Sequence, residues 1–185
     1  MLKKVVFLDR DGTINQNSVT YVKSESEFTF LPRSVQALRN LTTAGFTLIV
    51  ITNQSAISRK LLSLTELEKI HSKMKAAVES RGGMIRDIFY CPHLPEDGCD
   101  CRKPAPGLIH RARKKHDIDL AAAVMIGDSA RDIECAQNAG CGRSILVKTG
   151  IDNDAEPVIT QMGLRLDYVA KDLFDAARWI IGTLS

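Results

Sequence analysis

The sequence lacks the features that mark membrane-bound, exported or multidomain proteins. It has no apolar run approaching the length of a membrane span, no signal peptide, no internal repeat, and no low-complexity tract or linker. Its 185 residues are enough for one domain with a proper hydrophobic core. We therefore expect a cytoplasmic protein that is not attached to a membrane and that folds as a single domain over residues 1–185.

Charge and cysteine content are also modest. The net charge of +3 does not by itself indicate a nucleic-acid partner. The basic run 111–115 has no interleaved aromatic residues and spreads over more than one helix face, so we interpret it as a solvated surface and expect no nucleic acid. Five cysteines in a reducing compartment favour metal ligands and core residues over disulfides. Three histidines on expected helices have no partner in sequence and are interpreted as surface or satisfied side chains: His71, His110 and His116.

Short apolar runs alternate with helical patterns along the chain. We expect strands at about residues 5–8, 46–51, 85–90, 123–126 and 144–147. Helices are expected at about 32–45, 65–80, 107–116 and 131–139, and the tail 167–184 should hold a short extended piece and a terminal helix. The polar stretch 14–30 is interpreted as a flap or short hairpin over the end of the first strand. This alternation predicts the α/β class, with a doubly wound (Rossmann-like) parallel sheet.

The first strand runs directly into two carboxylates. Asp9 and Asp11 are two residues apart, so in an extended chain they can face one cavity while Arg10 points elsewhere. Gly12 allows a positive φ or a close approach of the backbone to a ligand. Open α/β sheets place their active sites at the carboxyl ends of the strands. An ordinary Asp-Gly turn is the alternative, but the whole string from Val5 to Thr13 favours catalysis.

This string resembles the first motif of the haloacid dehalogenase-like phosphatases. The resemblance implies that Asp9 attacks phosphorus, giving an aspartyl-phosphate, and that Asp11 is the acid and base. An ionised aspartate needs no base to activate it. We expect the neighbouring carboxylate to raise the pKa of Asp11, which suits proton donation to the departing alkoxide. Attack of one anion on another also requires a metal and a basic side chain from elsewhere in the chain.

A second motif follows the second strand, at the same edge of the predicted sheet. A hydroxyl and exposed backbone N–H groups there could hold phosphate oxygens, although such a stretch alone is usually a turn. Beside the first motif it matches the family's second motif, a Ser or Thr that ends the second strand. The resemblance implies a catalytic contribution from Thr52 and substrate contacts from the whole stretch: Thr52, Asn53, Gln54 and Ser55.

Two further acids follow the fourth strand. The resemblance implies that Asp128 completes a metal site with Asp9 and the backbone carbonyl of Asp11. A few hard oxygen ligands, supplemented by water and phosphate, favour Mg²⁺. Ser129 and Asp132 have capping-box spacing. Asp132 is therefore open between an outer-sphere role at the metal and a purely structural role as a helix cap.

The expected positive charge comes from Arg102 and Lys103. Lys103 matches the family's third motif, a lysine that holds the nucleophile and the phosphate together. Arg102 could give a bidentate grip on a second anionic or hydroxylated part of the substrate. Such a pair on a surface usually has no role, but these two residues follow the third strand and adjoin a cysteine-rich loop.

That loop, residues 91–101, predicts a zinc site. Three thiols and one imidazole lie within eleven residues: Cys91, His93, Cys99 and Cys101. Two close pairs of such ligands fit a closed tetrahedral Zn²⁺ site, which leaves no open position for catalysis. The zinc would be structural and would hold Arg102 and Lys103 in place. Reduced core cysteines are the alternative, although these lie among Pro, Asp and Gly residues.

Taken together, the motifs resemble one subfamily, from Lys4 to about Val147. These are the D,D-heptose 1,7-bisphosphate phosphatases and the closely similar histidinol-phosphate phosphatases. The resemblance implies a haloacid dehalogenase-like fold without a large cap domain. It also implies a Mg²⁺-dependent phosphomonoesterase that removes the C7 phosphate of a heptose bisphosphate, in activated-heptose biosynthesis for lipopolysaccharide. Substrate selection would then rest on the flap near residues 17–21, on the segment 52–55 and on Arg102. We expect a phosphorylated small-molecule substrate, a sugar bisphosphate, and a monomeric protein.

Three alternatives remain open. Histidinol phosphate is the nearest alternative substrate. A polynucleotide 3′-phosphatase would share the first two motifs, but the zinc loop and the lack of a kinase domain disfavour it. A non-catalytic receiver-like signalling domain also has a phosphorylatable Asp and Mg²⁺. In a receiver that Asp ends the third strand, where this chain has Tyr90 and Cys91.

Overall fold

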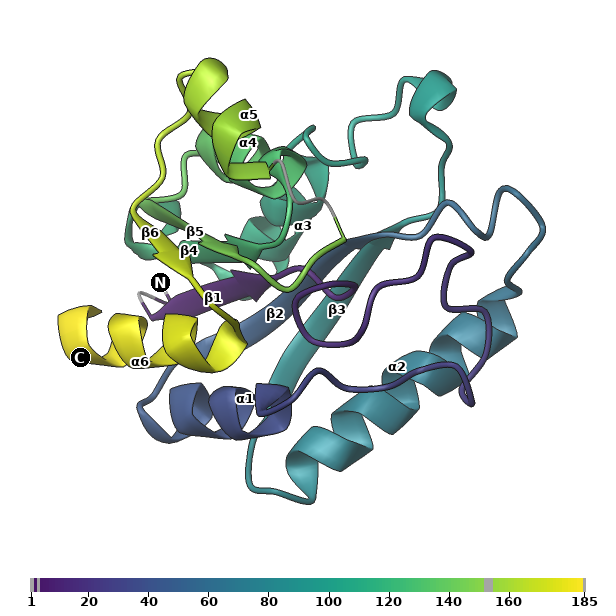
Figure 1. Cartoon of the computed structure of the whole chain (residues 1–185), viewed down its shortest axis with the longest axis horizontal. Coiled ribbons are helices and arrows are strands. Elements are labelled where there is room, and N and C mark those ends of the chain that lie inside the picture. The colour runs from purple at the N-terminus through teal and green to yellow at the C-terminus, as the bar shows by residue number, and fades with distance from the viewer. Residues whose placement is uncertain (1, 3, 152–154, 185) are drawn as a thin grey trace.

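The computed structural model describes residues 2, 4–151 and 155–184. Its strands and helices alternate along the chain (Figure 1). The strands are β1 (Val5–Leu8), β2 (Thr47–Asn53), β3 (Ile85–Cys91), β4 (Val124–Gly127), β5 (Arg143–Val147) and β6 (Tyr168–Ala170). The α-helices are α1 (Ser34–Thr43), α2 (Leu64–Glu79), α3 (Gly107–His116), α4 (Ala130–Ala139), α5 (Ala155–Gln161) and α6 (Leu173–Leu184). Short 3₁₀ turns cover Pro95–Asp97 and Leu120–Ala122.

All six strands form one parallel sheet in the order β3-β2-β1-β4-β5-β6. Chain order reverses at β1, which pairs with β2 on one side and with β4 on the other. The two connections that leave this point run to opposite faces of the sheet and open a crevice at the carboxyl ends of the strands. The predicted doubly wound parallel sheet is confirmed, and its switch point lies where β1 delivers Asp9.

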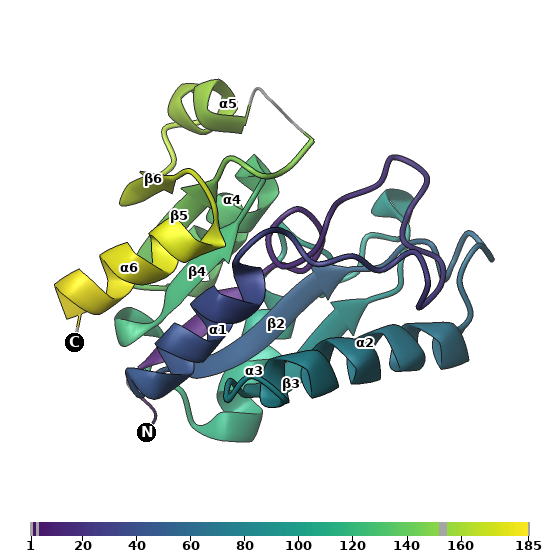
Figure 2. The same cartoon turned by 60° about the horizontal axis from the view of Figure 1, so that its bottom comes forward.

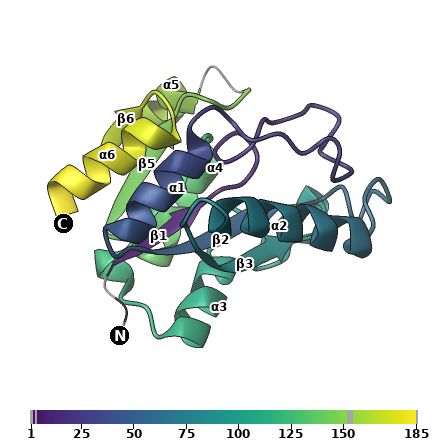
Figure 3. The same cartoon turned by 90° about the horizontal axis from the view of Figure 1, so that it is seen from below.

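Helices cover both faces of the sheet (Figures 2 and 3). The alternation of side chains along β1 shows how the core is divided, because Val6 and Leu8 pack on the face covered by α1, α2 and α6. Val5 and Phe7 point to the other face, where they pack with α3 and α4. With both faces covered, all four residues of β1 are at most 1% exposed. The central strand therefore presents its end to the crevice from a rigid support.

The flap is less regular than a hairpin. Residues 16–29 contain no strand, and the segment is held by isolated bridges from Asn15 to Asp11 and to Phe30. Val22 and Phe28 are buried in the core instead of pairing across a hairpin, which explains the apolar alternation seen in the sequence. In the tail, the expected extended piece and terminal helix are confirmed as β6 and α6, whereas helix α5 before them was not predicted.

The described residues contain no large cap domain. The two segments where one could be inserted, 9–33 and 92–106, hold irregular chain and a single 3₁₀ turn. None of the described helices is long and apolar enough to cross a membrane.

Candidate active site

The predicted catalytic residues gather in one cavity of about 260 Å³ at the carboxyl ends of the strands. Nearly all the side chains predicted for the reaction and the substrate line it: Asp9, Asp11, Thr52, Asn53, Ser55, Arg102, Lys103 and Asp128. Gln54 is the exception, because it does not line the cavity. The parallel topology brings together segments that are far apart in sequence.

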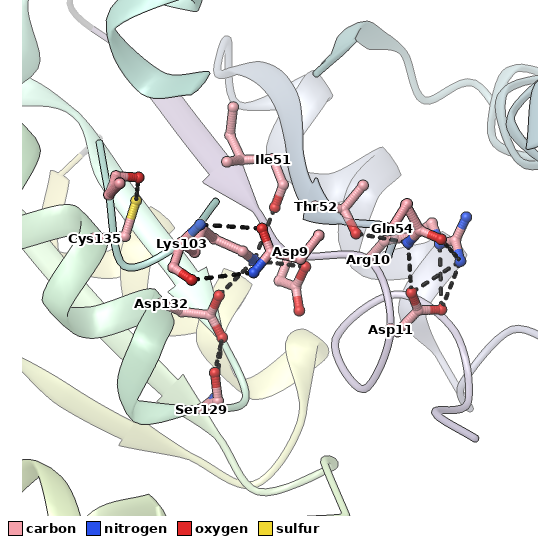
Figure 4. Close-up of polar contacts among 12 residues, drawn as sticks. Asp9, Arg10, Asp11, Ile51, Thr52, Gln54, Lys103, Ser129, Asp132 and Cys135 are labelled. Carbon is pink, nitrogen blue, oxygen red and sulfur yellow. Dashed lines mark hydrogen bonds and ion pairs between the residues drawn. The ribbon is translucent and has the colours of Figure 1, made fainter. Parts of the chain in front are cut away.

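Lys103 is the positive centre of the cavity (Figure 4). Its Nζ lies 2.7 Å from Asp9 Oδ1 and 2.5 Å from Asp132 Oδ1, and it donates to the carbonyl oxygen of Ile51 at 3.0 Å. The side chain is only 3% exposed. Burial alone would lower the pKa of Lys103, but the charges of Asp132 and Asp9 outweigh it and hold the pKa above its ordinary value. The lysine therefore stays charged beside the nucleophile predicted from the sequence.

Three buried acids form a cluster that could hold a metal ion. Carboxylate oxygens of Asp9, Asp128 and Asp132 lie within 4.8 Å of one another. Burial raises the pKa of Asp128 to about 9, and the negative charges of Asp9 and Asp132 add to this effect. Burial likewise raises the pKa of Asp9 to about 6, with Asp132 adding to the effect and Lys103 opposing it. Lys103 alone thus leaves excess negative charge, and an oxygen-coordinated divalent cation fits this donor set.

Two glycines allow this packing. A Cβ on Gly12 would lie 2.1 Å from Asp128 Oδ2, and the φ of Gly12 is +86°, as its predicted role requires. A Cβ on Gly127 would lie 2.3 Å from Asp132 Cβ. Larger residues at either position would displace an acid of the cluster.

Asp132 is shared between the cluster and the start of α4. Its Oδ2 accepts from the backbone N–H of Ser129 at 3.1 Å and from the Ser129 hydroxyl at 2.7 Å. Ser129 and Asp132 together form a capping box at the helix N-terminus. The other oxygen, Oδ1, contacts Lys103. The capping role is therefore present, and an outer-sphere role at the metal stays a prediction.

Asp11 sits in a separate group of contacts from Asp9 (Figure 4). Arg10 does not point elsewhere: its guanidinium folds back and donates to both Asp11 carboxylate oxygens, with Nη2 2.9 Å from each. Asn15 and Gln54 also donate to this carboxylate, each at 2.8 Å. Burial raises the pKa of Asp11, but the Arg10 charge and these hydrogen bonds outweigh it and lower the pKa below its usual value. The expectation that the pKa of Asp11 is raised by its neighbouring carboxylate is therefore wrong for this structure.

The second motif ties β2 to the lysine segment. Asn53 Oδ1 accepts from the backbone N–H of Lys103 at 3.0 Å, and its Nδ2 donates to the Lys103 carbonyl at 3.2 Å. The Thr52 hydroxyl lines the cavity and accepts from Gln54 Nε2 at 2.9 Å. Gln54 is buried beneath the cavity wall. Its direct contact with substrate stays a prediction.

The four predicted zinc ligands are assembled in loop 91–101. Their ligand atoms lie within 4.8 Å of one another. The Sγ atoms of Cys91, Cys99 and Cys101 are 3.2 to 3.6 Å apart, and His93 Nδ1 is 3.5 Å from Cys91 Sγ and 3.3 Å from Cys101 Sγ. A tetrahedron with Zn–S bonds of about 2.3 Å has edges of roughly 3.8 Å. The cluster could therefore hold Zn²⁺ after a small expansion.

The same loop positions Arg102. Its guanidinium Nη1 donates to the carbonyl oxygen of His93 at 3.1 Å, so an arginine that lines the cavity is held by a predicted zinc-ligand residue. Cys135 and Cys141 lie outside this cluster, as predicted, and pack among the apolar residues under α3 and α4.

Comparison with known proteins identifies the family. Residues 100–176 match the family profile described as HAD-hydrolase-like. Over 147 residues the chain is 46% identical to the D-glycero-beta-D-manno-heptose-1,7-bisphosphate 7-phosphatase of Bordetella bronchiseptica, covering 80% of this chain and 82% of the relative. The chain belongs to the heptose-bisphosphate phosphatase family. The member of that name from Escherichia coli K12 is 37% identical over 177 residues, covering 92% of this chain and 90% of the relative.

Solved structures of this phosphatase family have the same fold. The D,D-heptose 1,7-bisphosphate phosphatase from B. bronchiseptica, complexed with magnesium and phosphate, has a TM-score of 0.89 and 42% identity, covering 97% of this chain and 98% of that chain. The enzyme from Burkholderia thailandensis has a TM-score of 0.72 and 31% identity, covering 98% and 100%. The predicted haloacid dehalogenase-like fold is thereby confirmed.

In this member of the heptose-bisphosphate phosphatase family, the cavity is also lined by residues of the flap on which the resemblance placed substrate selection: Asn17, Ser18 and Tyr21. Ser129 and Arg131 line it too, and neither was predicted from the sequence to do so. Arg131 follows the Gly-Asp-Ser motif, and its charge next to Asp128 was an available signal. The flap residues reach the cavity along the irregular path of 16–29, and their contacts with substrate stay a prediction.

Proposed function

We propose that the protein is a Mg²⁺-dependent phosphomonoesterase that removes the C7 phosphate of D-glycero-D-manno-heptose 1,7-bisphosphate. The observation that carries the proposal is the buried Asp9–Lys103 pair beside Asp128 at the switch point, in a chain 46% identical to a phosphatase of that name. The relative at 46% identity is named for the beta anomer and one at 38% identity for the alpha anomer, so the higher identity favours the beta anomer for this chain. The product would enter activated-heptose biosynthesis for lipopolysaccharide.

The cavity supports an in-line displacement on phosphorus. An Asp9 oxygen attacks, and Lys103 neutralises charge shared by the carboxylate and the phosphate. The Thr52 hydroxyl lines the same cavity and can donate to a phosphate oxygen. Asp9, Asp128 and the backbone carbonyl of Asp11 would hold Mg²⁺, which would supply charge neutralisation to the phosphate.

The rim of the cavity suits the rest of a bisphosphate. Two arginines line it: Arg102, directly after loop 91–101, and Arg131, in the first turn of α4. Neither has an acidic partner within ion-pair distance among the described residues. Two guanidinium groups can bind a second phosphate or sugar hydroxyls at a distance from the reacting centre. We assign them, with Asn53 and Ser55, to substrate binding.

Zn²⁺ would occupy the loop ligands Cys91, His93, Cys99 and Cys101 in a structural role. The His93 carbonyl already holds Arg102, and Lys103 follows in the chain. Ordering this loop would therefore fix both basic residues at once.

Phosphate release tests the proposal. Purified protein with Mg²⁺ is assayed on both anomers of heptose 1,7-bisphosphate, on histidinol phosphate and on a 3′-phosphorylated oligonucleotide. We expect the highest kcat/KM for a heptose anomer. A preference for histidinol phosphate would contradict the proposed substrate and would leave the assignments of the catalytic residues unchanged. No release from any ester would contradict the phosphatase function.

The expectations of a single domain, a monomer and a cytoplasmic location stay predictions. Size-exclusion chromatography with light scattering measures the oligomeric state. The receiver-like alternative is disfavoured by the position of the acids, because Asp9 ends β1 whereas the third strand ends at Cys91.

A further inference from the structure

A turn that follows β5 packs against two of the predicted metal ligands. Leu146 pairs with Gly127 across the parallel strands β5 and β4, so the chain that leaves β5 emerges beside Asp128. The turn comprises residues 148–150, and its first backbone N–H donates to the carbonyl oxygen of Ala170 on β6 at 3.0 Å. None of its three residues lines the catalytic cavity. The sheet therefore holds the turn, and the turn contacts the site from outside the space for substrate.

The first contact of this turn restrains the glycine of the first motif. The Thr149 hydroxyl donates to the carbonyl oxygen of Gly12 at 2.6 Å. On its other side, the Gly12 N–H donates to the carbonyl oxygen of Asn15 at 2.8 Å. Glycine has the largest backbone freedom of any residue, and Gly12 uses it with a φ of +86°. The two hydrogen bonds restrain the peptide groups on both sides of Gly12, one of which carries the backbone carbonyl of Asp11 that is predicted to bind Mg²⁺.

The second contact encloses the carboxylate of Asp128. A Cβ on Gly150 would lie 2.2 Å from Asp128 Oδ2 and 2.8 Å from Asp128 Cγ. A Cβ on Gly12 would lie 2.1 Å from the same oxygen and 3.2 Å from Gly150 Cα. The carboxylate of Asp128 thus packs against the backbones of two glycines that are close to each other. A side chain at position 150 would need the space that Asp128 Oδ2 occupies.

This packing matters more for Asp128 than for the other acids of the cluster. Lys103 holds Asp9 and Asp132 through ion pairs of 2.7 and 2.5 Å. Among the residues that the structure describes, Asp128 forms no ion pair. The position of its carboxylate therefore depends on the backbones that surround it.

Space is the reason for a glycine at position 150. The φ of Gly150 is outside the left-handed range that favours glycine, unlike that of Gly12. An alanine can therefore adopt the same backbone conformation, and the three atoms nearest to its methyl group would all belong to the side chain of Asp128. Replacing Gly150 by alanine thus moves one predicted ligand without straining the turn.

From these contacts we infer that the turn 148–150 is a positioning element for the divalent metal site. Thr149 orients the backbone of the first motif, and Gly150 sets the position of the Asp128 carboxylate. The inference rests on the metal site of the proposed phosphatase function. Mg²⁺ demands near-ideal octahedral geometry at about 2.0–2.1 Å, so a displaced ligand weakens its binding. Thr149 and Gly150 act through predicted ligands and are positioning residues, not catalytic ones.

The test measures metal binding without substrate, so that the readout does not depend on turnover. Mn²⁺ also takes oxygen ligands and serves as a paramagnetic substitute for Mg²⁺. The free ion is quantified by electron paramagnetic resonance, and the Kd for Mg²⁺ is obtained by competition. Gly150→Ala adds a methyl group beside Asp128. Thr149→Val replaces the hydroxyl by a methyl group of similar size, and Thr149→Ser keeps the hydroxyl.

We expect Gly150→Ala to raise the Kd for Mn²⁺ by about 10- to 100-fold, the usual range for residues that orient metal ligands. Thr149→Val should raise it by about 3- to 10-fold, and Thr149→Ser should stay within about twofold of the wild-type protein. An unchanged Kd in Gly150→Ala or in Thr149→Val would overturn the inference, as would a Thr149→Ser variant that binds as weakly as Thr149→Val. Because Thr149→Val adds no volume, it tests the inference even if Gly150→Ala does not fold.

The dependence of the phosphatase rate on Mg²⁺ and urea unfolding distinguish positioning from a general loss of structure. A positioning role predicts that the Mg²⁺ concentration for half-maximal rate rises with the Kd, and that kcat recovers most of its wild-type value at saturating Mg²⁺. Lower resistance to urea with an unchanged Kd would show a purely structural role for the turn and would overturn the inference.

Two matched controls lie outside the cavity. The Thr160 hydroxyl donates to the carbonyl oxygen of Glu156 at 3.0 Å within α5, and a Cβ on Gly182 would meet no atom within 4 Å. Thr160→Val and Gly182→Ala should therefore keep the wild-type Kd. A raised Kd in these controls as large as in the turn variants would overturn the specific role of the turn.

Asp128→Asn separates this inference from the proposed function. It removes the charge of a predicted ligand and should weaken Mn²⁺ binding at least as much as Gly150→Ala does. Wild-type affinity in Asp128→Asn would contradict the metal site on which the proposed function depends. Weak binding in Asp128→Asn together with wild-type affinity in the turn variants would refute the role of the turn alone.

Discussion

The protein has two clusters of potential metal ligands, and they are assembled in opposite ways. The acid cluster, Asp9, Asp128 and Asp132, comes from the ends of two strands and the first turn of a helix, and it needs Lys103 from a third connection. The thiol cluster in loop 91–101 comes from eleven consecutive residues. The acid cluster can therefore assemble only when the sheet is complete, whereas the thiol cluster needs only its own loop and the strand that precedes it.

The clusters also differ in charge. The acids are almost fully buried and repel one another, so the pKa values of Asp9 and Asp128 are raised even with Lys103 present. The thiol cluster binds a metal as thiolates and gives up its remaining protons when the metal enters. We therefore expect the acid cluster to exchange its metal rapidly through an open cavity, and the thiol cluster to hold its metal in a closed site. The predictions below test this contrast.

The largest effect is expected at the nucleophile. Asp9→Asn should lower turnover by about 10⁴-fold or more, because no other group forms the covalent intermediate. Urea unfolding should show the fold intact, since Lys103 keeps Asp132 as a partner. Asp167→Asn, at a carboxylate remote from the cavity, is the control. Appreciable turnover in Asp9→Asn would contradict the nucleophile assignment.

Metal removal should separate the two clusters directly. Brief treatment with a chelator should abolish turnover, and Mg²⁺ alone should restore it while the zinc content measured by mass spectrometry stays unchanged. Restoration that required zinc would show that the two clusters are not independent.

A smaller effect is expected when the thiol cluster is broken. Cys99→Ser should release zinc, loosen residues 91–103 and lower kcat/KM by about 10- to 100-fold through misplacement of Lys103 and Arg102. Cys141→Ser is the matched control, since this cysteine lies outside the cluster, and it should retain zinc and activity. Unchanged zinc content and rate in Cys99→Ser would remove the zinc assignment.

The smallest effect is expected at His71, which lies next to Arg10 on the side of the molecule that holds the acid cluster. The folded protein binds a proton at His71 less readily than the unfolded chain does, because the pKa of His71 is lowered to about 3. Lowering the pH from 8 to 5 protonates only the unfolded form, so this residue should lower the free energy of unfolding by about 2 kcal/mol. In urea unfolding, the loss of stability between these pH values should be smaller by about that amount in His71→Gln. An identical pH dependence in the two proteins would contradict a neutral buried His71.

Much of the site could be predicted from the sequence because its signals are local. Asp9 and Gly12 follow directly from a buried strand, and the thiol ligands are close in sequence. Lys103 was placed correctly in the cavity because it follows the third strand and adjoins the cysteine loop. Of the two interpretations of 14–30, a flap or a short hairpin, the hairpin is wrong, because it depended on an alternation that does not come from strand pairing. Val22 and Phe28 alternate as in a strand, but both are buried in the core with residues that are distant in sequence.

The sequence by itself determined the strand ends, the carboxylate pair and the spacing of the four loop ligands, since each depends on residues within a few positions of one another. Only the tertiary structure decided the orientation of Arg10, which local alternation directed away from Asp11. Its guanidinium is turned back by partners from other parts of the fold, Gln54 after β2 and His71 on α2. A buried charge takes the orientation in which its hydrogen bonds are satisfied, and those partners are known only once the chain is packed.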